Sequence, residues 1–384
     1  MGFYEKTSYL DVDVSNKKVA VRLDFNDCFV EDLIINEYKF FANINSIKTL
    51  FNLTNKIVVF YNISGKKEDF FNIIKKHINF SEIESIDEIS DINFKNKTIL
   101  FLNIEKLDED FENEKKNCLI INEKIDYFIF DAISLANSKT ISTYVISKYA
   151  KSIVGPIVKT ELDNINILYT KEKDEEKTFI CGHDKIYNKI HYIQNMVHFT
   201  NKTFFVGGCC LTILKLVHKN IGKSFFEHEY TQELIKMQNN YANKIVLPED
   251  FYGTSNIGSE EYVFININTN KDDKIFLLDI GENSLNKIKK KCDTSTKILF
   301  DGVLGVIEIP KFQKSTKELL THLANYKKSK YVFICSNTLV NSLKQFGFKP
   351  DDFSYVSHAE NNIFNLFTKN NIHALMIIDD KKNS

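Results

Sequence analysis

The sequence predicts an α/β protein with two domains, each built on a doubly wound parallel sheet. A chain of 384 residues is longer than a single hydrophobic core usually serves, so two domains are expected. Apolar runs rich in β-branched and aromatic residues alternate with segments of helical period, which is typical of parallel sheets crossed by helices. Those runs are apolar at successive positions, which indicates strands buried on both faces.

The first half of the chain shows this alternation clearly. Strands are expected at 18–23, 57–61, 98–102, 118–121 and 126–130, with helices at 38–52 and 67–78. In the second of these helices Phe70, Phe71 and Ile74 recur three to four residues apart on one side.

The second half repeats the pattern after Gly155-Pro156, and residues 157–164 are expected to form a connecting helix. Strands are expected at 165–169, 177–181, 203–206, 244–247, 262–267, 275–279, 297–300, 305–309, 330–335 and 373–378. Helices are expected at 184–197, 209–218, 226–241, 283–291, 313–325, 337–346 and 360–369.

Composition restricts the class of protein. A net charge of −1 supplies no basic excess for nucleic acid or an acidic membrane surface. Seven cysteines without regular spacing indicate reduced, intracellular thiols rather than a disulfide framework. No apolar run is long enough to span a membrane. We therefore expect a soluble cytoplasmic protein that does not bind nucleic acid.

Polar side chains follow the first predicted strand. Val19 to Leu23 reads as a short buried strand, and Asp24 and Asn26 lie at its carboxyl end, where open parallel sheets bind ligands. Arg22 lies within this strand and is the only arginine in the chain, the other 49 of the 50 basic residues being lysines. The sequence predicts a ligand site at this sheet edge.

Lys185 and Lys189 follow a second strand, in a segment that starts at Gly182 and is expected to open a helix. Their four-residue spacing places both side chains on one face of the first turn. Two cations there are unfavourable against the positive end of a helix, unless an anion is held between them. The alternative is an ordinary exposed lysine pair, which would be favoured if this stretch stood alone.

Two further stretches combine glycines or carboxylates with a preceding strand. Gly207 and Gly208 permit close approach of backbone or ligand, or simply make a tight turn. Asp301 and Glu308 flank Gly302 and Gly305. The Glu308 carboxylate is suited to hold ribose hydroxyls; the alternative is an exposed side chain with no functional role. Other nucleotide motifs fail: Gly222-Lys223-Ser224 ends like a P-loop, but Val217 stands where glycine is required.

In their order and spacing these stretches resemble the phosphoglycerate kinase family over nearly the whole chain. The resemblance rests on residues 21–26, 131–132, 182–190, 206–208, 221–224, 244–248, 278–281 and 302–308. It implies a monomeric glycolytic phosphotransferase with a hinge helix between two α/β domains that close on each other. Residues 1–157 would hold 3-phosphoglycerate, 158–375 would hold ATP or ADP with Mg²⁺, and 376–384 would return to the N-terminal domain.

The resemblance also implies roles for individual residues. Asp24 and Asn26 match groups on the substrate hydroxyl and carboxylate, Arg22 lies beside them, and Lys39 takes the place of an essential substrate-bridging arginine. On the nucleotide side, Lys185 matches the lysine that supports the transferring phosphoryl group. The remaining matches are Lys189 to the nucleotide phosphates, Glu308 to the ribose, Gly207 and Gly208 to the adenine, and Asp301, Asn337 and Thr338 to nucleotide-binding positions.

This sequence departs from the family pattern at both sites. The arginine- and histidine-rich patch for the substrate phosphate is replaced by Asn62, Gly65, Lys66, Glu105, Asn137 and Ser138. Two glycine-rich turns of the nucleotide site read Cys335 to Thr338 and His358 to Asn362, without glycine. Asp301 replaces an asparagine and would repel phosphate unless a metal intervenes.

Two hypotheses follow. The first is a divergent kinase in which Lys185 and Lys39 stabilise the moving phosphoryl group, with Lys66 and Lys139 partly rebuilding the phosphate patch. The second is a catalytically weakened or inactive descendant that binds nucleotide or serves as a regulatory or scaffold protein. Lysine provides a point charge without the planar fork of arginine, so the replacements change the chemistry of substrate binding.

Overall fold

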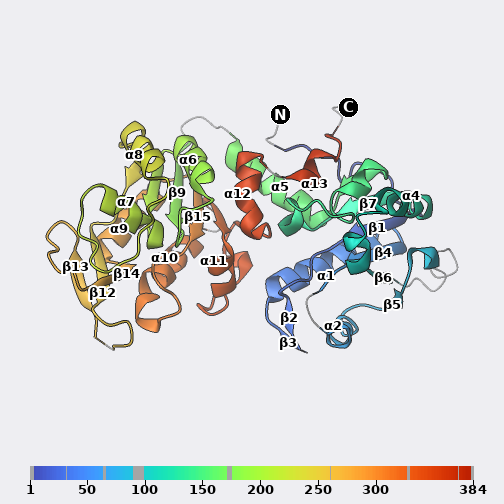
Figure 1. The fold of residues 1–384 in the computed structure, drawn as a ribbon, viewed down its shortest axis with the longest axis horizontal. Helices are drawn as coiled ribbons and strands as arrows, with labels where there is room; N and C mark the ends of the chain where they lie inside the picture. Colours follow the sequence, from blue (N-terminus) through green and yellow to red (C-terminus); the bar gives the residue numbers. More distant parts are fainter. Residues whose placement is uncertain are drawn as a thin grey trace. The chain divides into compact units, whose positions relative to one another are not determined.

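The computed structural model describes residues 4–31, 33–63, 66–89, 99–170, 175–259, 261–326, 329–370 and 372–381. The chain forms two compact units, one of Met1–Thr170 with Lys369–Ser384 and one of Lys171–Thr368 (Figure 1). Each contains a six-stranded parallel sheet with helices, which confirms the two-domain α/β fold. The boundary expected between residues 157 and 158 lies inside a helix of the first unit.

The sheet of the first unit has the order β5-β6-β4-β1-β7-β8, and every neighbouring pair is parallel. Its strands are β1 (Lys18–Arg22), β4 (Lys56–Tyr61), β5 (Phe80–Ile83), β6 (Ile99–Asn103), β7 (Tyr127–Phe130) and β8 (Ser152–Val154). Val19 pairs with Ile57 on one side and Tyr127 on the other, so β1 is central and its carboxyl end lies at the middle of one sheet edge.

Aromatic side chains fill one layer of this unit's core. Phe25, Phe40 and Phe70 are fully buried, and the Phe70 ring stacks on Tyr61 with centroids 5.1 Å apart. Phe40 comes from α1 (Glu37–Phe51) and Phe70 from α2 (Lys67–Ile74), so these helices cover the sheet with the apolar faces that the sequence predicts. Asn36 begins α1 by accepting a hydrogen bond from the Lys39 amide.

The remaining elements of the first unit are short, apart from two longer helices. They are the hairpin β2 (Phe29–Val30) and β3 (Leu33–Ile34), helices α3 (Glu105–Glu109), α4 (Glu114–Lys124), α5 (Pro156–Tyr169) and α13 (His373–Met376), and 3₁₀ turns at Ile86–Glu88, Ile133–Leu135 and Val145–Lys148. The end of the chain lies against its beginning. The Lys381 amide donates to the Glu5 carbonyl at 2.7 Å, and the Thr7 amide donates to the Asp379 carbonyl at 2.9 Å.

The sheet of the second unit has the order β11-β10-β9-β15-β16-β17 and is also parallel throughout. Its strands are β9 (Lys177–Gly182), β10 (Lys202–Phe205), β11 (Ile245–Val246), β15 (Lys297–Gly302), β16 (Tyr331–Cys335) and β17 (Tyr355–Val356). From β9 the strands β10 and β11 follow towards one edge of the sheet, and from β15 the strands β16 and β17 follow towards the other, so the strand order reverses between β9 and β15. Open parallel sheets bind ligands at the carboxyl ends of the strands flanking such a switch point.

A smaller antiparallel sheet and a set of helices surround this large sheet. The small sheet has the order β13-β12-β14, with β12 (Asp250–Thr254), β13 (Val263–Asn266) and β14 (Phe276–Ile280). The helices are α6 (Ile190–Phe199), α7 (Gly207–Leu216), α8 (Thr231–Asn240), α9 (Glu282–Thr294), α10 (Lys314–Ala324), α11 (Asn337–Ser342) and α12 (Ile363–Thr368), with 3₁₀ turns at Pro310–Phe312, Pro350–Asp352 and Glu360–Asn362. No helix among the described ranges is both long and apolar enough to span a bilayer.

Four predicted strands are wrong. Residues 118–121 lie within α4 and 165–169 within α5, because each apolar run buries residues three apart and exposes one between them, as Ile167 is exposed between the buried Ile165 and Leu168. Residues 373–376 are helical as α13, and 305–309 form turns rather than a strand. The predicted strand 98–102 is β6, with residue 98 outside the described residues.

Candidate functional site

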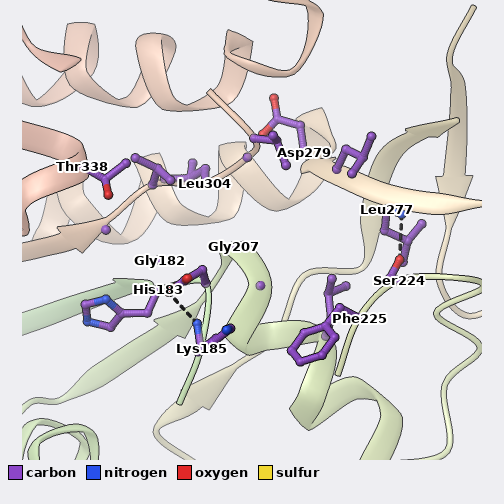
Figure 2. A pocket seen from close by; sticks show the side chains of 18 of the residues that line it. Gly182, His183, Lys185, Gly207, Ser224, Phe225, Leu277, Asp279, Leu304 and Thr338 are labelled. Carbon is purple, nitrogen blue, oxygen red and sulfur yellow. Dashed lines mark hydrogen bonds between the residues drawn. The ribbon is translucent and has the colours of Figure 1, made fainter. Parts of the chain in front are cut away.

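A cavity of about 580 Å³ lies in the second unit at the switch point of its sheet. The carboxyl ends of β9 and β15 contribute Gly182 and Gly302 to its lining. Figure 2 shows Lys185, Ser224 and Phe225 on one side of the cavity, with Asp279 and Leu304 across from them. The cavity has the size of a small-ligand site and occupies the position where such folds bind ligands.

Of the predicted nucleotide residues, all but Asp301 line this cavity. The lining includes Lys185, Lys189, Gly207, Gly208, Glu308, Asn337 and Thr338. They come from segments of the chain more than 100 residues apart, which the parallel strands of one sheet bring to a single edge. Asp301 lies fully buried at the end of β15 and is absent from the lining.

Gly207 and Gly208 begin α7 at the base of the cavity. Gly207 has a φ of 61°, in the left-handed region that favours glycine. A Cβ atom on Gly208 would lie 2.3 Å from the carbonyl oxygen of Asp184, so only glycine fits there without movement of the backbone. This close packing fixes the first turn of α7 against the turn that carries Lys185. The backbone amides at this end of α7 form the positive pole of the helix dipole.

The two candidate lysines lie in a turn before α6 rather than in its first turn. The sequence predicted a helix from residue 184, but α6 begins at Ile190, and Asn188 has a φ of 62° that interrupts a regular helix. Lys185 Nζ lies 5.9 Å from the ring centroid of Phe225, and Lys189 Nζ lies 3.5 Å from Asp184 Oδ1. Both lysines line the cavity, and the turn before α6, rather than a helix face, sets their positions.

A buried histidine that the sequence analysis did not single out separates Asp301 from the cavity. His183 Nε2 lies 2.9 Å from Asp301 Oδ2, and the Tyr192 hydroxyl donates to the same oxygen at 2.7 Å. Burial acts to raise the pKa of Asp301, but the facing His183 ring and the hydrogen bonds of His183 and Tyr192 together hold it below its usual range. The side-chain partners of this carboxylate among the described residues are thus an imidazole and a phenol hydroxyl. Sequence gave no signal for it beyond the position of His183 directly after a strand.

The segment at the start of α11 retains a glycine-like backbone without glycine. Ser336 has a φ of 75° and lines the cavity beside Asn337 and Thr338. Its hydroxyl caps α11 by accepting a hydrogen bond from the Leu339 amide at 3.3 Å. The second glycine-free turn contains Glu360 with a φ of 51°. Both turns therefore adopt left-handed conformations that are strained for residues with a side chain.

A second buried carboxyl group borders the cavity. Asp279 accepts hydrogen bonds from the Ile280 amide at 3.0 Å and from the Ser315 amide at 3.2 Å, and the Ser315 hydroxyl also donates to it. Burial, opposed by these hydrogen bonds, raises the pKa of Asp279 to about 7. Its oxygens are committed to the start of α10, which fixes the wall of the cavity rather than presenting a free charge.

The predicted substrate residues lie at the carboxyl end of β1 in the first unit. Lys39 Nζ lies 2.7 Å from Asp24 Oδ2, and the Ser134 hydroxyl donates to that oxygen at 2.5 Å. Burial opposes ionisation, but the Lys39 ammonium and these hydrogen bonds hold the pKa of Asp24 below its usual range. The partly exposed Asn26 donates its amide N–H to Asp24 Oδ1 at 3.0 Å.

Arg22 faces the interior of the unit. Its Nε donates to the Ser142 hydroxyl at 3.0 Å, and its Nη1 donates to the Leu23 carbonyl. Asp108 accepts hydrogen bonds from the Ser142 amide and hydroxyl, each at 2.7 Å, which places a carboxylate behind the guanidinium. The chain's single arginine thus supports the strand end on which Asp24 lies.

The residues expected to replace the phosphate patch are exposed or partly exposed. Lys66 is exposed at the start of α2, Lys139 is exposed after the 3₁₀ turn at Ile133–Leu135, and Asn62 is partly exposed. Glu105 is exposed at the start of α3, and Asn137 is exposed near Lys139. Gly65 lies outside the described residues.

The described residues offer no cluster of three or more histidine, cysteine, aspartate or glutamate side chains that could hold a metal ion. Around the cavity Asp279 is bonded to Ser315, and Asp301 to His183 and Tyr192. These donor sets do not fit a resident magnesium ion, so a magnesium ion in this cavity would be carried by its ligand. All seven cysteines are free and buried.

Comparisons with known proteins agree with this arrangement. A sequence model described as Phosphoglycerate kinase matches residues 9–368. A phosphoglycerate kinase of Finegoldia magna is 25% identical over 346 residues, covering 84% of this chain and 87% of the relative. One of Buchnera aphidicola is 28% identical over 233 residues, covering 60% of this chain and 58% of the relative, so the matched stretch spans little more than half of that protein.

Solved structures share the fold over nearly the full length. The structure of phosphoglycerate kinase from Coxiella burnetii superposes with a TM-score of 0.85, at 21% identity, covering 97% of this chain and 98% of that one. The enzyme from Pyrococcus horikoshii superposes with a TM-score of 0.78 at 17% identity, again covering 97% and 98%. The match of the family's sequence model to residues 9–368 shows that this chain belongs to the phosphoglycerate kinase family.

Proposed function

We propose that the chain is a phosphotransferase that reversibly transfers a phosphoryl group from ATP to 3-phosphoglycerate, which gives 1,3-bisphosphoglycerate and ADP. The observation that carries this proposal is the cavity at the switch point of the second sheet, whose lining includes Lys185, Lys189 and a Gly-Gly helix start. Family membership supports the choice of substrates.

The nucleotide would bind in this cavity with its phosphates toward Lys185 and Lys189. Apolar side chains that include Leu211, Phe251 and Leu277 also line the cavity and suit a purine base, and Glu308, also in the lining, would hold the ribose. The magnesium ion would enter as the nucleotide complex, where it neutralises phosphate charge. These residues would therefore position the nucleotide and stabilise its charge, which is most of what phosphoryl transfer requires of a protein.

The acceptor would bind at the carboxyl end of β1 in the first unit. Asn26 and the Asp24–Lys39 pair would hold its hydroxyl and carboxylate, with Arg22 supporting the pair from within the unit. Lys39 would supply the positive charge that the family's arginine provides, but through a single ammonium rather than a planar fork. Lys66 and Lys139, both exposed, would contribute to holding the substrate phosphate.

The proposal is tested by a coupled assay of the purified protein with ATP, magnesium and 3-phosphoglycerate. We expect turnover that is lost in the Lys185→Ala variant, because the ammonium facing the transferring phosphoryl group is removed. Lys236→Ala is the matched control, since Lys236 is exposed on α8 and does not line the cavity. Turnover that is unchanged in Lys185→Ala contradicts the mechanism, and absence of turnover in the unmodified protein favours a nucleotide-binding or regulatory role.

A further inference from the structure

We propose that His183 and Asp301 form a proton-linked phosphate grip, in which His183 takes up a proton from solvent when phosphates bind in the cavity. The inference rests on the proposed nucleotide site and adds a titrating group to it. It makes His183 a phosphate-binding residue beside Lys189, and it predicts pH-dependent affinity at this site.

The first step concerns the two ring nitrogens of His183. Nε2 lies 2.9 Å from Asp301 Oδ2, whereas Nδ1 lies 3.5 Å from Lys189 Nζ. An ammonium group has only donors, so the nitrogen that faces it is the one with the lone pair. Without a ligand the ring is therefore neutral, with its hydrogen on Nε2, donated to Asp301. A hydrogen on Nδ1 would point at the Lys189 ammonium.

The second step concerns the negative charge behind the ring. Asp301 is fully buried, and its Oδ1 atom is an acceptor without a hydrogen-bond partner among the described residues. A buried carboxylate with one free oxygen is costly unless positive charge stands close by. The neutral ring compensates Asp301 only in part, so this surrounding favours an imidazolium once the opposing charge of Lys189 is offset.

The third step concerns what a phosphate does to this balance. His183 and Lys189 both line the cavity, so an anion between them offsets the Lys189 charge and draws its ammonium away from Nδ1. Nδ1 then gains a proton and becomes a second donor toward phosphate oxygen, while Nε2 keeps its bond to Asp301. Histidine is suited to this exchange because its charge changes near neutral pH. The result is a cationic contact in a chain with a single arginine.

The groups around His183 favour this titration over others. The charged and titratable groups near the ring are Asp301 of β15, Tyr192 of α6, Lys189, Asp184 and Lys185 of the turn, and Cys181 of β9. Phe364 of α12 packs against the ring at a centroid distance of 5.4 Å and brings no charge. Burial and the charge of Asp301 raise the pKa of Tyr192 well above its usual range, and burial raises that of Cys181. Near neutral pH these two groups stay protonated, which leaves His183 to respond.

The inference is tested by isothermal titration calorimetry of Mg-ADP binding in buffers that differ in ionisation enthalpy. The dependence of the observed enthalpy on the buffer gives the number of protons taken up on binding. We expect the unmodified protein to take up more protons than His183→Gln, by up to about one. The variant retains an amide donor for Asp301 but cannot titrate. The affinity of the unmodified protein for Mg-ADP should weaken as pH rises, by up to about tenfold per pH unit, and the variant should lose this dependence.

His191→Gln is the matched control, since His191 is exposed on α6 and does not line the cavity. It should take up as many protons as the unmodified protein. Asp301→Asn, which removes the buried charge, should reduce the uptake and supplies an independent variant if His183→Gln does not fold. Equal proton uptake by the unmodified protein and His183→Gln overturns the inference while leaving the nucleotide site in place. Absence of Mg-ADP binding to the unmodified protein overturns the proposed function as well.

Discussion

Lys39 Nζ lies 2.7 Å from Asp24 Oδ2, and the side chains of both residues are almost completely buried. The Asp24 carboxylate is therefore compensated by the Lys39 ammonium, by the hydrogen bond from Ser134 and by the nearby Arg22. The pair occupies the carboxyl end of the central strand β1, where the sequence predicts a ligand. A buried ion pair of this kind holds both side chains in place, but removal of either partner leaves a buried charge uncompensated.

Removing one member of this pair should destabilise the first unit. Lys39→Met leaves Asp24 buried without the ammonium group that contacts it, and we expect a loss of about 3 kcal/mol in the free energy of unfolding, measured by urea titration at pH 7. The double variant Asp24→Asn with Lys39→Met removes both charges and should recover most of that loss. Equal stability of Lys39→Met and the unmodified protein would show that the pair is not energetically coupled.

Asp131 should make stability decrease as pH rises from about 4 to about 7. It lies buried at the start of α5 and accepts hydrogen bonds from the Ser46 hydroxyl and the Val158 amide, while burial raises its pKa to about 7. In this window the folded chain keeps a proton that the unfolded chain has lost, so folding becomes less favourable as pH increases. The effect is absent below pH 4 and constant above pH 7.

Asp131→Asn removes this contribution. The difference in unfolding free energy between the variant and the unmodified protein should shift in favour of the variant by up to about 4 kcal/mol between pH 4 and pH 7. Urea titrations at intervals of pH measure the shift. Asp279, whose pKa is also raised to about 7, remains in both proteins and cancels in the difference. A difference that does not change with pH would mean that Asp131 is ionised when folded.

Gly208→Ala should weaken nucleotide binding. The added Cβ would lie 2.3 Å from the Asp184 carbonyl oxygen, so the turn that carries Lys185 must move. We expect the affinity for Mg-ADP, measured by calorimetry, to fall by about tenfold or more, because small displacements of positioning groups are costly. Gly258→Ala is the control, since its nearest contact would be Asn256 Oδ1 at 3.6 Å. Equal affinities of the two variants would contradict the placement of the nucleotide beside α7.

Ser336→Gly should stabilise the second unit by about 1 kcal/mol, because glycine removes the strain of a φ of 75°. The gain exceeds the few tenths of a kcal/mol lost when glycine replaces a serine helix cap. Ser336→Ala keeps the strain, loses the cap and should be destabilising. Thermal unfolding of the three proteins gives the order, and a glycine variant less stable than the serine protein would show that the side chain contributes more than the backbone strain costs.

Much of the fold could be predicted from the sequence. Strands with several consecutive apolar residues, such as 18–23 and 177–181, appear as β1 and β9, because burial on both faces of a parallel sheet leaves no other pattern. The strands predicted from short apolar runs at 118–121 and 165–169 are wrong, since a few apolar residues fit either a buried strand or the buried stripe of a helix. Length and tertiary contacts decide between them.

The site divides in the same way. The sequence shows which polar residues follow strands, and the rule that ligands bind at strand carboxyl ends then groups Lys185, Lys189, Gly207 and Gly208, which the structure places in one cavity. The folded chain is needed to show that His183 faces Asp301 and that Arg22 points inward to Ser142. Such pairings join residues about 120 positions apart. They depend on strand register and side-chain burial, which periodicity along the chain does not encode.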